Sequence, residues 1–274
     1  MEPVRELVFL KLGGSLITDK SQPLTAREDI IHQLAEEVAA FHAAHPESQL
    51  VLGHGSGSFG HAIASRYQTQ KGVHSADEWQ GFAEVWAAAH QLNQVVIRHF
   101  AAVGLPVVTF PPSAGISADN AEVLHWDLAP LQTALAHGLM PVVLGDVIFD
   151  QTLGGTIFST EKVFQYLTRN LHPTRILLAG IEKGVYQDPS RPDKVLGLIT
   201  PNDTFKISPQ LKGSHQVDVT GGMQSKVDLM LNLVRENPGL TVRIFSAEAS
   251  GSLYEALEGA KLGTLIHTDT TQQP

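Results

Sequence analysis

Short apolar segments rich in β-branched residues alternate with longer segments of helical periodicity along almost the whole chain of 274 residues. The predicted strands are residues 4–11, 49–52, 106–109, 141–144, 175–179, 241–245 and 264–266. The predicted helices between them are residues 25–44, 76–103, 128–137, 160–170, 223–236 and 252–258. Alternating strands and helices need crossover connections, which build a mainly parallel sheet with helices on both faces. The sequence therefore predicts an α/β fold with a central sheet between two helical layers.

Three further segments complete this prediction. Residues 147–150 and 155–158 are separated by Gln-Thr-Leu-Gly, which predicts a β-hairpin. Residues 188–203 are rich in Pro and Asp and predict an exposed loop, and the polar tail 268–274 is expected to fray. No linker divides the chain, so we expect one domain, 1–274, whose parts share one sheet.

The composition excludes several classes of protein. With no cysteine, the chain has no disulfide, thiolate catalysis or cysteine-bound metal. A formal net charge of −9 argues against nucleic acid as a partner. No 18-residue apolar run and no signal segment is present, so we expect neither a membrane span nor export, and we predict a cytoplasmic protein. The 13 histidines are scattered and form no metal-binding pair at helical spacing.

The first predicted strand delivers Lys11 directly into a turn that contains Gly13 and Gly14, and Lys20 follows nine residues after Lys11. Glycines after a strand leave backbone N–H groups free to face an anion, and a nearby lysine adds a full positive charge. The spacing does not match the Walker A pattern G-x-x-x-x-G-K-[ST]. A phosphate-binding turn is therefore one interpretation, and a tight turn with solvated lysines is the alternative.

A second glycine-rich loop, with Gly55, Gly57 and Gly60, matches G-x-G-x-x-G after a strand and before a helix. A dinucleotide-binding unit would need a second strand within about 30 residues that ends in an acidic residue. The next long segment, 76–103, has helical periodicity instead. We therefore interpret the loop as an anion cradle at a helix N-terminus, with His61 in the first turn placed to donate to a phosphate. A satisfied surface histidine is the alternative for His61.

Two more glycine-containing turns follow predicted buried or helix-opening segments. Gly145 and Asp146 end the strand 141–144, and ligands of α/β sheets bind beyond the carboxyl ends of strands. Asp146 could orient lysines or hold Mg²⁺ there, or it could simply cap a turn. The segment Asp-Val-Thr-Gly-Gly-Met at 218–223 opens a helix, and Lys226 lies one turn inside it. That arrangement suits the β- and γ-phosphates of ATP.

Taken together, these motifs resemble the amino acid kinase superfamily and, within it, the isopentenyl phosphate kinase branch, over almost the whole chain. The matching segments are Lys-Leu-Gly-Gly-Ser at 11–15, His-Gly-Ser-Gly-Ser-Phe-Gly-His at 54–61, Gly-Asp at 145–146, Gly-Val-Tyr at 184–186 and 218–226. The histidine that ends the second loop, His61, marks kinases that phosphorylate a phosphate rather than a carboxylate. One departure is the sequence Gly-Ile-Glu-Lys at 180–183, where many members have T-D-V-D, and it leaves the detailed nucleotide contacts open.

The resemblance implies an αβα fold and ATP-dependent phosphorylation of isopentenyl phosphate to isopentenyl diphosphate, with Mg²⁺ carried by ATP rather than by the protein. It also implies a homodimer, an acceptor-binding lobe at about 1–170 and a nucleotide-binding lobe at about 171–274. The implied catalytic residues are Lys11, Lys20, Lys226, His61 and Asp146. The implied ATP-binding residues are Lys11, Leu12, Gly13, Gly14, Ser15, Gly180, Gly184, Val185, Tyr186, Gly221, Gly222 and Lys226. The implied substrate-binding residues include Gly55, Ser56, Gly57, His61 and Gly155, of which Ser56, Gly57 and His61 are expected to hold the acceptor phosphate.

An apolar substrate tail needs a dry slot close to His61. Phe82, Val85 and Trp86 lie on one stripe of the predicted helix 76–103 and could line such a slot, although a stripe of this kind is also typical of plain core. Two rival functions remain at this point. One is a kinase of fosfomycin-type antibiotics or other phosphonates, which needs a small polar pocket, and the other is a nucleotide-binding protein of the same fold without catalysis.

Overall fold

The computed structural model describes residues 6–188, 194–203 and 222–268, apart from the side chains of residues 61 and 62. Within these ranges an eight-stranded sheet forms the centre of the molecule. In spatial order its strands are β10 (Leu198–Ile199), β12 (Thr264–Ile266), β11 (Thr241–Ser246), β9 (Arg175–Gly180), β1 (Leu7–Leu12), β2 (Gln49–His54), β6 (Met140–Leu144) and β3 (Val107–Thr109). Only the β11–β12 pair is antiparallel among the described pairings of this sheet, which confirms the mainly parallel prediction.

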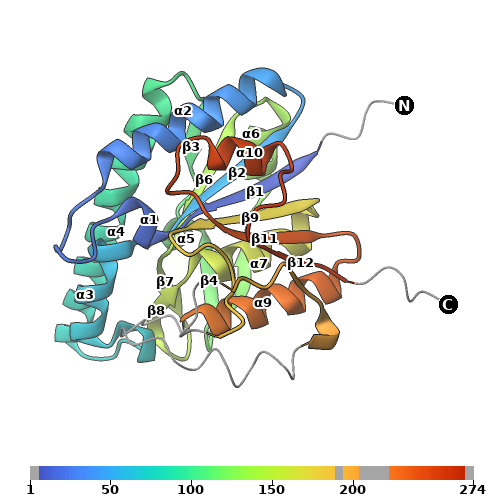
Figure 1. The fold of residues 1–274 in the computed structure, drawn as a ribbon. Coiled ribbons are helices and arrows are strands. Elements are labelled where there is room, and N and C mark those ends of the chain that lie inside the picture. The colour runs from blue at the N-terminus through green and yellow to red at the C-terminus, as the bar shows by residue number, and fades with distance from the viewer. Residues whose placement is uncertain (1–5, 189–193, 204–221, 269–274) are drawn as a thin grey trace.

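Helices cover both faces of this sheet, as Figure 1 shows. The described helices are α1 (Gly14–Ile17), α2 (Glu28–Ala44), α3 (Gly57–Tyr67), α4 (Ala76–Ala102), α5 (Pro112–Gly115), α6 (Ala129–Ala136), α7 (Thr160–Leu171), α9 (Gly222–Glu236) and α10 (Ser252–Leu257), with short 3₁₀ turns η1 (Thr69–Lys71) and η2 (Pro201–Asp203). Every helix predicted from periodicity is present within a few residues. Ser75 is the N-cap of α4, and its hydroxyl and the Glu78 carboxylate form a capping box.

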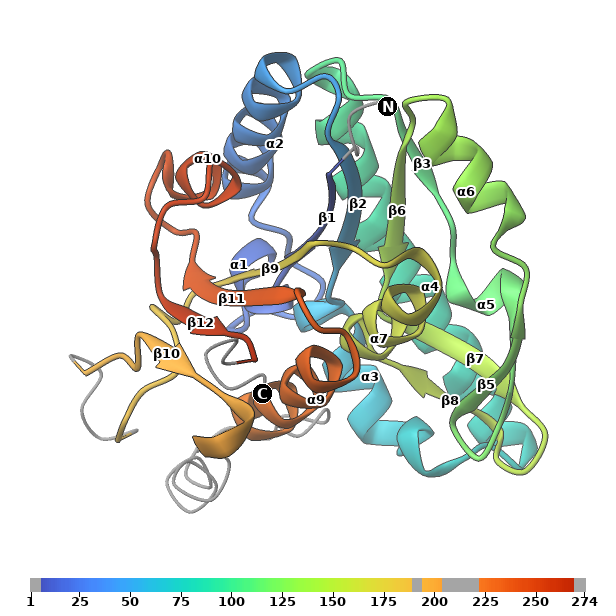
Figure 2. The same cartoon turned by 90° about the vertical axis from the view of Figure 1, so that its right-hand side faces the viewer.

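The alternating side chains of β1 show how the two layers form. Val8, Leu10 and Leu12 are buried against α2, α4 and α10, whereas Leu7 and Phe9 are buried against α6, α7 and α9. Figure 2 shows α2 and α10 together on one side and α9 on the other. Because both faces of the strand are buried, it reads as a continuous apolar run rather than an alternating one.

A second sheet of four strands lies beyond the end of β6, in the order β5 (Glu122–Trp126), β4 (Ile116–Asp119), β7 (Asp146–Asp150) and β8 (Gly154–Phe158). The β7–β8 hairpin was predicted, but β4 and β5 were not. Their turn places Asn120 and Ala121 in the left-handed region, at φ of 50° and 63°. The carboxylate of Asp150 accepts hydrogen bonds from the N–H groups of both residues, at 3.0 and 2.7 Å, and so stabilises a turn that lacks the usual glycine.

The segment 188–203 is only partly the exposed loop that was predicted. Strand β10 pairs with β12, and Ile199 is fully buried in the core. Residues 189–193 of this segment lie outside the described residues, as do 218–221 and 269–274 of the regions discussed above.

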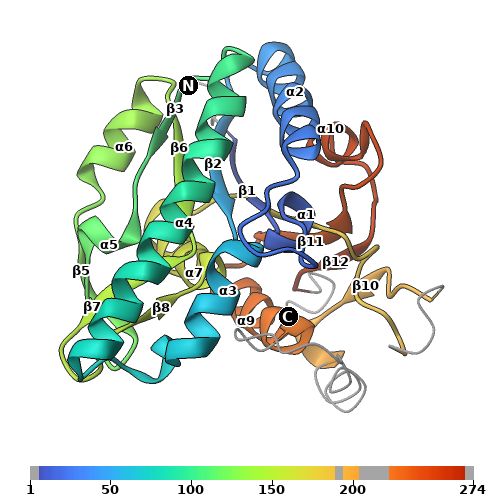
Figure 3. The ribbon, with the colours of Figure 1, turned by 90° about the vertical axis from the view of Figure 1, so that its left-hand side faces the viewer.

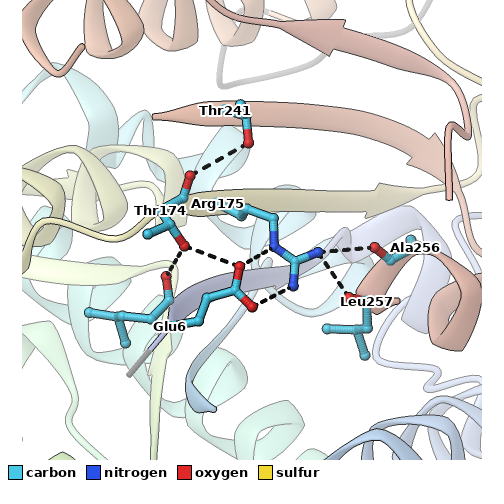
Figure 4. Close-up of polar contacts among 7 residues, drawn as sticks. Glu6, Thr174, Arg175, Thr241, Ala256 and Leu257 are labelled. Atoms are coloured by element: carbon cyan, nitrogen blue, oxygen red, sulfur yellow. Dashed lines mark hydrogen bonds and ion pairs between the residues drawn. The ribbon is translucent and has the colours of Figure 1, made fainter. Parts of the chain in front are cut away.

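The amino ends of the central strands are tied together by charged groups. Arg175, at the start of β9, donates to both carboxylate oxygens of Glu6, at 2.7 and 2.9 Å, and to the Leu257 carbonyl at the end of α10, at 2.9 Å (Figure 4). The Thr174 hydroxyl joins the same carboxylate at 3.2 Å. This Glu6–Arg175 cluster links β1, β9 and α10 at the end of the sheet opposite the glycine loops.

Candidate active site

The glycine-containing turns lie side by side at the carboxyl ends of four adjacent strands. The Gly13 N–H donates to the Ala179 carbonyl of β9 at 2.8 Å, and the Gly55 N–H donates to the Leu12 carbonyl of β1 at 3.0 Å. The Gly145 N–H in turn donates to the His54 carbonyl of β2 at 3.0 Å. These bonds continue the sheet pairing one residue past each strand, so each turn is anchored on the strand beside it.

The turns after β1 and β2 touch backbone to backbone. A Cβ atom on Gly14 would lie 2.4 Å from the amide nitrogen of Gly57, and one on Gly57 would lie 2.6 Å from the Gly14 carbonyl oxygen. Gly57 also has φ of +49°, a conformation that costs an L-residue about 1–2 kcal/mol. The two predicted phosphate loops therefore form one surface in which only glycine fits at these two positions.

The hydroxyl of Thr18 joins the two loops. It donates to the Gly14 carbonyl at 2.7 Å and accepts a hydrogen bond from the Ser58 N–H in α3 at 3.0 Å. Thr18 is buried, and the sequence reading did not single it out. Its contacts fix the start of α3 relative to α1, and thereby fix where the first amides of both helices lie.

The prediction that both Gly13 and Gly14 amides cradle a phosphate needs a correction, because the Gly13 N–H is already bound to Ala179. The next N–H groups along the chain are those of Gly14 and Ser15, at the start of α1. We now predict that these two N–H groups, and not that of Gly13, face the phosphate. On the acceptor side, Ser56 precedes α3 and its hydroxyl lies against Gly60, where a Cβ would lie 2.5 Å from it.

Lys11 ends the buried strand β1 and is 6% exposed. Its Nζ lies 3.1 Å from Oε1 of Glu161, in the first turn of α7. Burial acts to raise the pKa of Glu161, but the positive charges of Lys11 and Lys226 outweigh burial and lower that pKa. Glu161 therefore stays ionised. Its negative charge interacts with both Lys11 and Lys226, two of the predicted catalytic lysines.

Asp146 was predicted to orient lysines, but the structure gives its fully buried side chain other partners. Its Oδ2 lies 3.2 Å from Nε2 of His90 and accepts from the Ser113 N–H at 3.1 Å, and its Oδ1 accepts from the Val147 N–H at 2.9 Å. The lysine-orienting position belongs to Glu161 instead.

His54 is fully buried between the glycine loops and α4. Its Nε2 lies 3.1 Å from the side-chain oxygen of Asn93, and its Nδ1 lies 3.2 Å from the Gly55 carbonyl. Burial lowers the pKa of His54, which keeps the ring neutral beside Lys11. The hydroxyl of Thr160 donates to the His54 carbonyl at 2.7 Å, which ties the loop to the start of α7.

Fewer contacts are described for the remaining predicted catalytic residues. Lys20 lies on an exposed loop, and Lys226 lies in the second turn of α9, close enough to Glu161 to affect its charge. His61 lies in α3, but its side chain is outside the described residues, as is Gly221. Gly222 begins α9. The roles of these residues in catalysis and binding stay predictions.

Several predicted ATP-binding residues have places that limit what they can do. The side chains of Leu12 and Val185 are fully buried in the core, so only their backbone could contact a nucleotide, and the Val185 N–H is bound to Thr264 at 2.8 Å. The Gly180 carbonyl accepts from the Ala247 N–H at 2.9 Å. Gly184 packs against Thr264 and Val195, and Tyr186 pairs with Val195.

An apolar groove of about 450 Å³ lies between α4, α5 and β7. Figure 3 shows the long helix α4 with β7 and β8 beside its N-terminal part. The groove is lined by Trp79, Phe82, Ala83, Trp86, His90, Pro111, Ser113, Ala114 and Phe149. The rings of Trp79, Phe82 and Phe149 contact one another at centroid distances of 5.1–6.1 Å.

The groove confirms that Phe82 and Trp86 line an apolar space, but it corrects the prediction for Val85. Val85 is buried in a small core cluster with Ala64, Val73, Phe82 and Val147, and it does not line the groove. Phe82 belongs to both sets, because it lies three residues before Val85 and four residues before Trp86 on the same helix. Gly155 packs under Phe82, where a Cβ would lie 2.6 Å from the ring.

Six polar residues of this site were not predicted from the sequence: Thr18, His90, Asn93, Ser113, Thr160 and Glu161. Glu161 follows Ser-Thr at the start of a helix. Acidic residues are common there because they interact favourably with the helix dipole, so the local sequence does not distinguish Glu161 from other helix-start carboxylates. His90 gave a detectable signal, because it is a polar residue four positions after Trp86 on the apolar stripe of α4.

Comparisons with known proteins agree with the observed α/β fold. A model of the amino acid kinase family matches residues 6–246. The chain is 31% identical over 267 residues to the isopentenyl phosphate kinase of Methanocaldococcus jannaschii, covering 95% of this chain and 98% of that protein. It is 30% identical to the isopentenyl phosphate kinase of Arabidopsis thaliana, covering 80% of this chain and 73% of that protein.

Solved structures give the same result for the fold. An X-ray structure of isopentenyl phosphate kinase superposes with a TM-score of 0.80 at 29% identity, covering 95% of this chain and all of that one. A product complex of the Thermoplasma acidophilum isopentenyl phosphate kinase superposes with a TM-score of 0.76 at 24% identity and supports the fold. None of the described helices combines the length and the apolar composition that a membrane span requires.

Proposed function

Because this chain belongs to the amino acid kinase family, we propose that it transfers the γ-phosphoryl group of ATP to isopentenyl phosphate and releases isopentenyl diphosphate and ADP. The observation that carries this proposal is the apolar groove, whose lining residue His90 contacts Asp146 directly after the glycine turn at Gly145. A phosphate-binding surface that continues into a groove of aromatic side chains suits an acceptor with an anionic head and a hydrocarbon tail.

Transfer between two phosphates brings several negative charges together, so the protein has to position the groups and neutralise charge. Lys11 and Lys226 would do this for the transferring phosphoryl group, with Lys20 at its edge. Glu161 holds the Lys11 ammonium at 3.1 Å and so limits where that charge can move before substrates bind. No general base is needed, because a phosphate monoester is already an anion near neutral pH.

The glycine loops would supply amide donors to both substrates. In this proposal the Gly14 and Ser15 amides face the γ-phosphate, and Ser56, Gly57 and His61 hold the acceptor phosphate at the start of α3. Because Thr18 fixes the two loops to each other, donor and acceptor phosphates would be held at a set distance. Holding reacting groups in line in this way supplies much of the rate enhancement of such enzymes.

Mg²⁺ enters this proposal as the ion that accompanies ATP. Among the described residues, the Glu161 carboxylate is paired with Lys11, and Asp146 is bound to His90 and to two backbone N–H groups, so both carboxylates have partners within the protein rather than forming an open cation site. The ATP oxygens would therefore hold the ion, whose chemical contribution is to neutralise developing charge on the phosphates.

Three further proposals rest on the resemblance. The chain is proposed to form a homodimer, to act in the cytoplasm, and to bind the acceptor through residues up to about 170 and the nucleotide through the rest. The larger sheet runs through both parts, with β1 and β9 paired along the boundary between them. Sedimentation of the purified protein would test the dimer.

An ATP-consumption screen tests the function directly. The panel is isopentenyl phosphate, fosfomycin, a simple alkyl phosphonate and glutamate, each with ATP and Mg²⁺. We expect turnover of isopentenyl phosphate far above that of the other three, with isopentenyl diphosphate identified by mass spectrometry. Preferred turnover of fosfomycin would replace the proposed acceptor by a phosphonate, and no turnover of any monophosphate would favour a nucleotide-binding protein without catalysis.

A further inference from the structure

His90 lines the groove and contacts Asp146, which directly follows Gly145 in one of the glycine-containing turns. It is one helical turn from Asn93, which contacts His54 directly before the second glycine loop, and one turn from Trp86, which also lines the groove. These contacts connect the imidazole of His90 both to the groove and to the residues that precede or follow the glycine loops.

The imidazole is held in a closed ring of contacts. Nε2 of His90 lies 3.2 Å from Oδ2 of Asp146, and the ring stacks on Trp86 with centroids 4.3 Å apart. The indole N–H of Trp86 donates to the Ser113 hydroxyl at 3.1 Å, and the Ser113 N–H returns to Oδ2 of Asp146 at 3.1 Å. Three residues from three separate elements, Asp146, Trp86 and Ser113, therefore fix the position and tilt of the imidazole. A side chain held in this way is typical of a ligand-binding group rather than of a residue that only fills space in the core.

The pairing also determines which nitrogen is left for a ligand. The buried carboxylate of Asp146 accepts hydrogen bonds, so Nε2 of His90 carries a proton. Within the described part of the chain, Nδ1 of His90 makes no hydrogen bond, and the side chain is 18% exposed at the groove. A protonated ring would thus present Nδ1–H to an anion in the groove while Nε2–H stays on Asp146.

We propose that His90 is a specificity-determining residue that donates from Nδ1 to the acceptor's phosphate group on the side where its tail begins. Asp146 is then a positioning residue, which holds the ring so that Nδ1 faces the groove. The inference rests on the proposed function, because it assigns His90 to the acceptor of that reaction. It gives the groove a polar end that selects a phosphate monoester over an acceptor with a neutral head.

The test compares three variants with the parent enzyme. His90→Ala removes the donor, and His90→Gln keeps a side-chain N–H that can reach Asp146 but offers no cation to the groove. His99→Ala is the matched control, because His99 lies on the same helix and also pairs with a carboxylate, Glu28, at 3.1 Å, but does not line the groove. Calorimetry of isopentenyl phosphate without ATP, KM values for both substrates and thermal melting are measured for each.

We expect His90→Ala and His90→Gln to weaken isopentenyl phosphate binding about 10- to 100-fold, the range for a hydrogen bond to a charged group. The KM for ATP should change less than about twofold, and His99→Ala should match the parent in both. If His90→Gln retains parental affinity, His90 serves only to hold Asp146 and the inference is wrong. Equal losses for ATP and acceptor would also contradict it.

The parent enzyme separates this inference from the proposed function. If it does not phosphorylate isopentenyl phosphate, the proposed acceptor is wrong. A parent that turns over isopentenyl phosphate, together with variants of unchanged acceptor affinity, would overturn the His90 inference alone. Should His90→Ala fail to fold, His90→Gln decides the question.

Discussion

The two ends of the central strands differ in how tightly they are built. At the amino ends, Gly104, Gly138 and Gly239 lie in turns where an added Cβ would meet nothing within 4 Å. At the carboxyl ends, Gly14 and Gly57 lie where a Cβ would come within 2.4–2.6 Å of other backbone atoms. At the amino ends, glycine thus allows the backbone conformation of a turn. At the carboxyl ends, it allows two loops to approach each other closely.

The charged groups at the two ends of the strands also differ. The Glu6–Arg175 cluster at the amino ends is satisfied within the protein, because the guanidinium binds a carboxylate and a helix-end carbonyl. At the carboxyl ends, two lysines share the field of one ionised carboxylate, Glu161. The positive charges of Lys11 and Lys226 at that end suit phosphates, and the other end contributes stability.

The largest effect that would sharpen this contrast is expected from the lysines. Lys11→Ala or Lys226→Ala should lower kcat by roughly 10²–10⁴, as removal of one preorganised charge donor does in other enzymes. The fold should survive. Steady-state kinetics and circular dichroism measure both, with the exposed Lys261→Ala as control. A kcat within a few-fold of the parent would remove that lysine from the mechanism.

The next effect concerns the contact between the two loops. Gly57→Ala should lower the free energy of unfolding by more than about 2 kcal/mol, because left-handed strain and backbone overlap add. Activity should fall at least about tenfold, since misplacing the reacting groups by an ångström is costly. Gly197→Ala is the matched control, because its Cβ would meet nothing within 4 Å and no left-handed conformation is required. Equal behaviour of the two variants in urea titrations would contradict the contact.

At the opposite end, stability should change without activity. Arg175→Ala removes a two-point contact with Glu6 and a helix-end hydrogen bond, and should cost about 1–3 kcal/mol in the free energy of unfolding. We expect kcat and both KM values to stay within about twofold of the parent. A large loss of kcat in the folded variant would break the division between the two ends.

The groove extends the comparison to the acceptor tail. Phe82→Ala should raise the ratio of kcat/KM for geranyl phosphate over isopentenyl phosphate several-fold, because each further buried methylene contributes at most about 0.8 kcal/mol. Val85→Ala is the control, since Val85 packs in the core beside the groove rather than in it. It should lower the melting temperature and leave the ratio unchanged. Any parallel change of the ratio in both variants would argue against the groove as the tail site.

The smallest effect is expected in the pH dependence of stability. Burial lowers the pKa of His54, so the unfolded state binds a proton that the folded state does not. Its contribution to stability is complete above the unfolded pKa of about 6.5 and is lost as the pH falls below it. The free energy of unfolding of His54→Gln should therefore depend less steeply on pH between about 7 and 5 than that of the parent. Identical slopes would show that His54 is not held neutral.

The sequence predicted the layers of the fold because strands and helices here follow a strong local pattern. It missed the β4–β5 hairpin because the turn at Asn120 and Ala121 has no glycine and depends on Asp150, 29 residues away. It also missed β10, since a two-residue strand in a segment rich in Pro and Asp gives no periodic signal.

The site was predicted to a similar degree and for the same reason. Glycine loops and lysines next to strands are local features, so Lys11, Gly14 and Gly57 could be proposed from spacing. Which carboxylate meets which cation is decided by tertiary packing. Asp146 and Glu161 both lie near strand ends, yet only the structure shows that Asp146 holds His90 and Glu161 holds Lys11.

The backbone contact between Gly14 and Gly57 has a consequence for changes in chain length. Two loops that interlock with no free space between them cannot accept an inserted residue, because any added length would separate the first turns of α1 and α3. The open turns at Gly104, Gly138 and Gly239 carry no such restriction. New termini, affinity tags or fused domains should therefore be tolerated at the amino ends of the strands, where the molecule can be cut and rejoined without disturbing its chemistry.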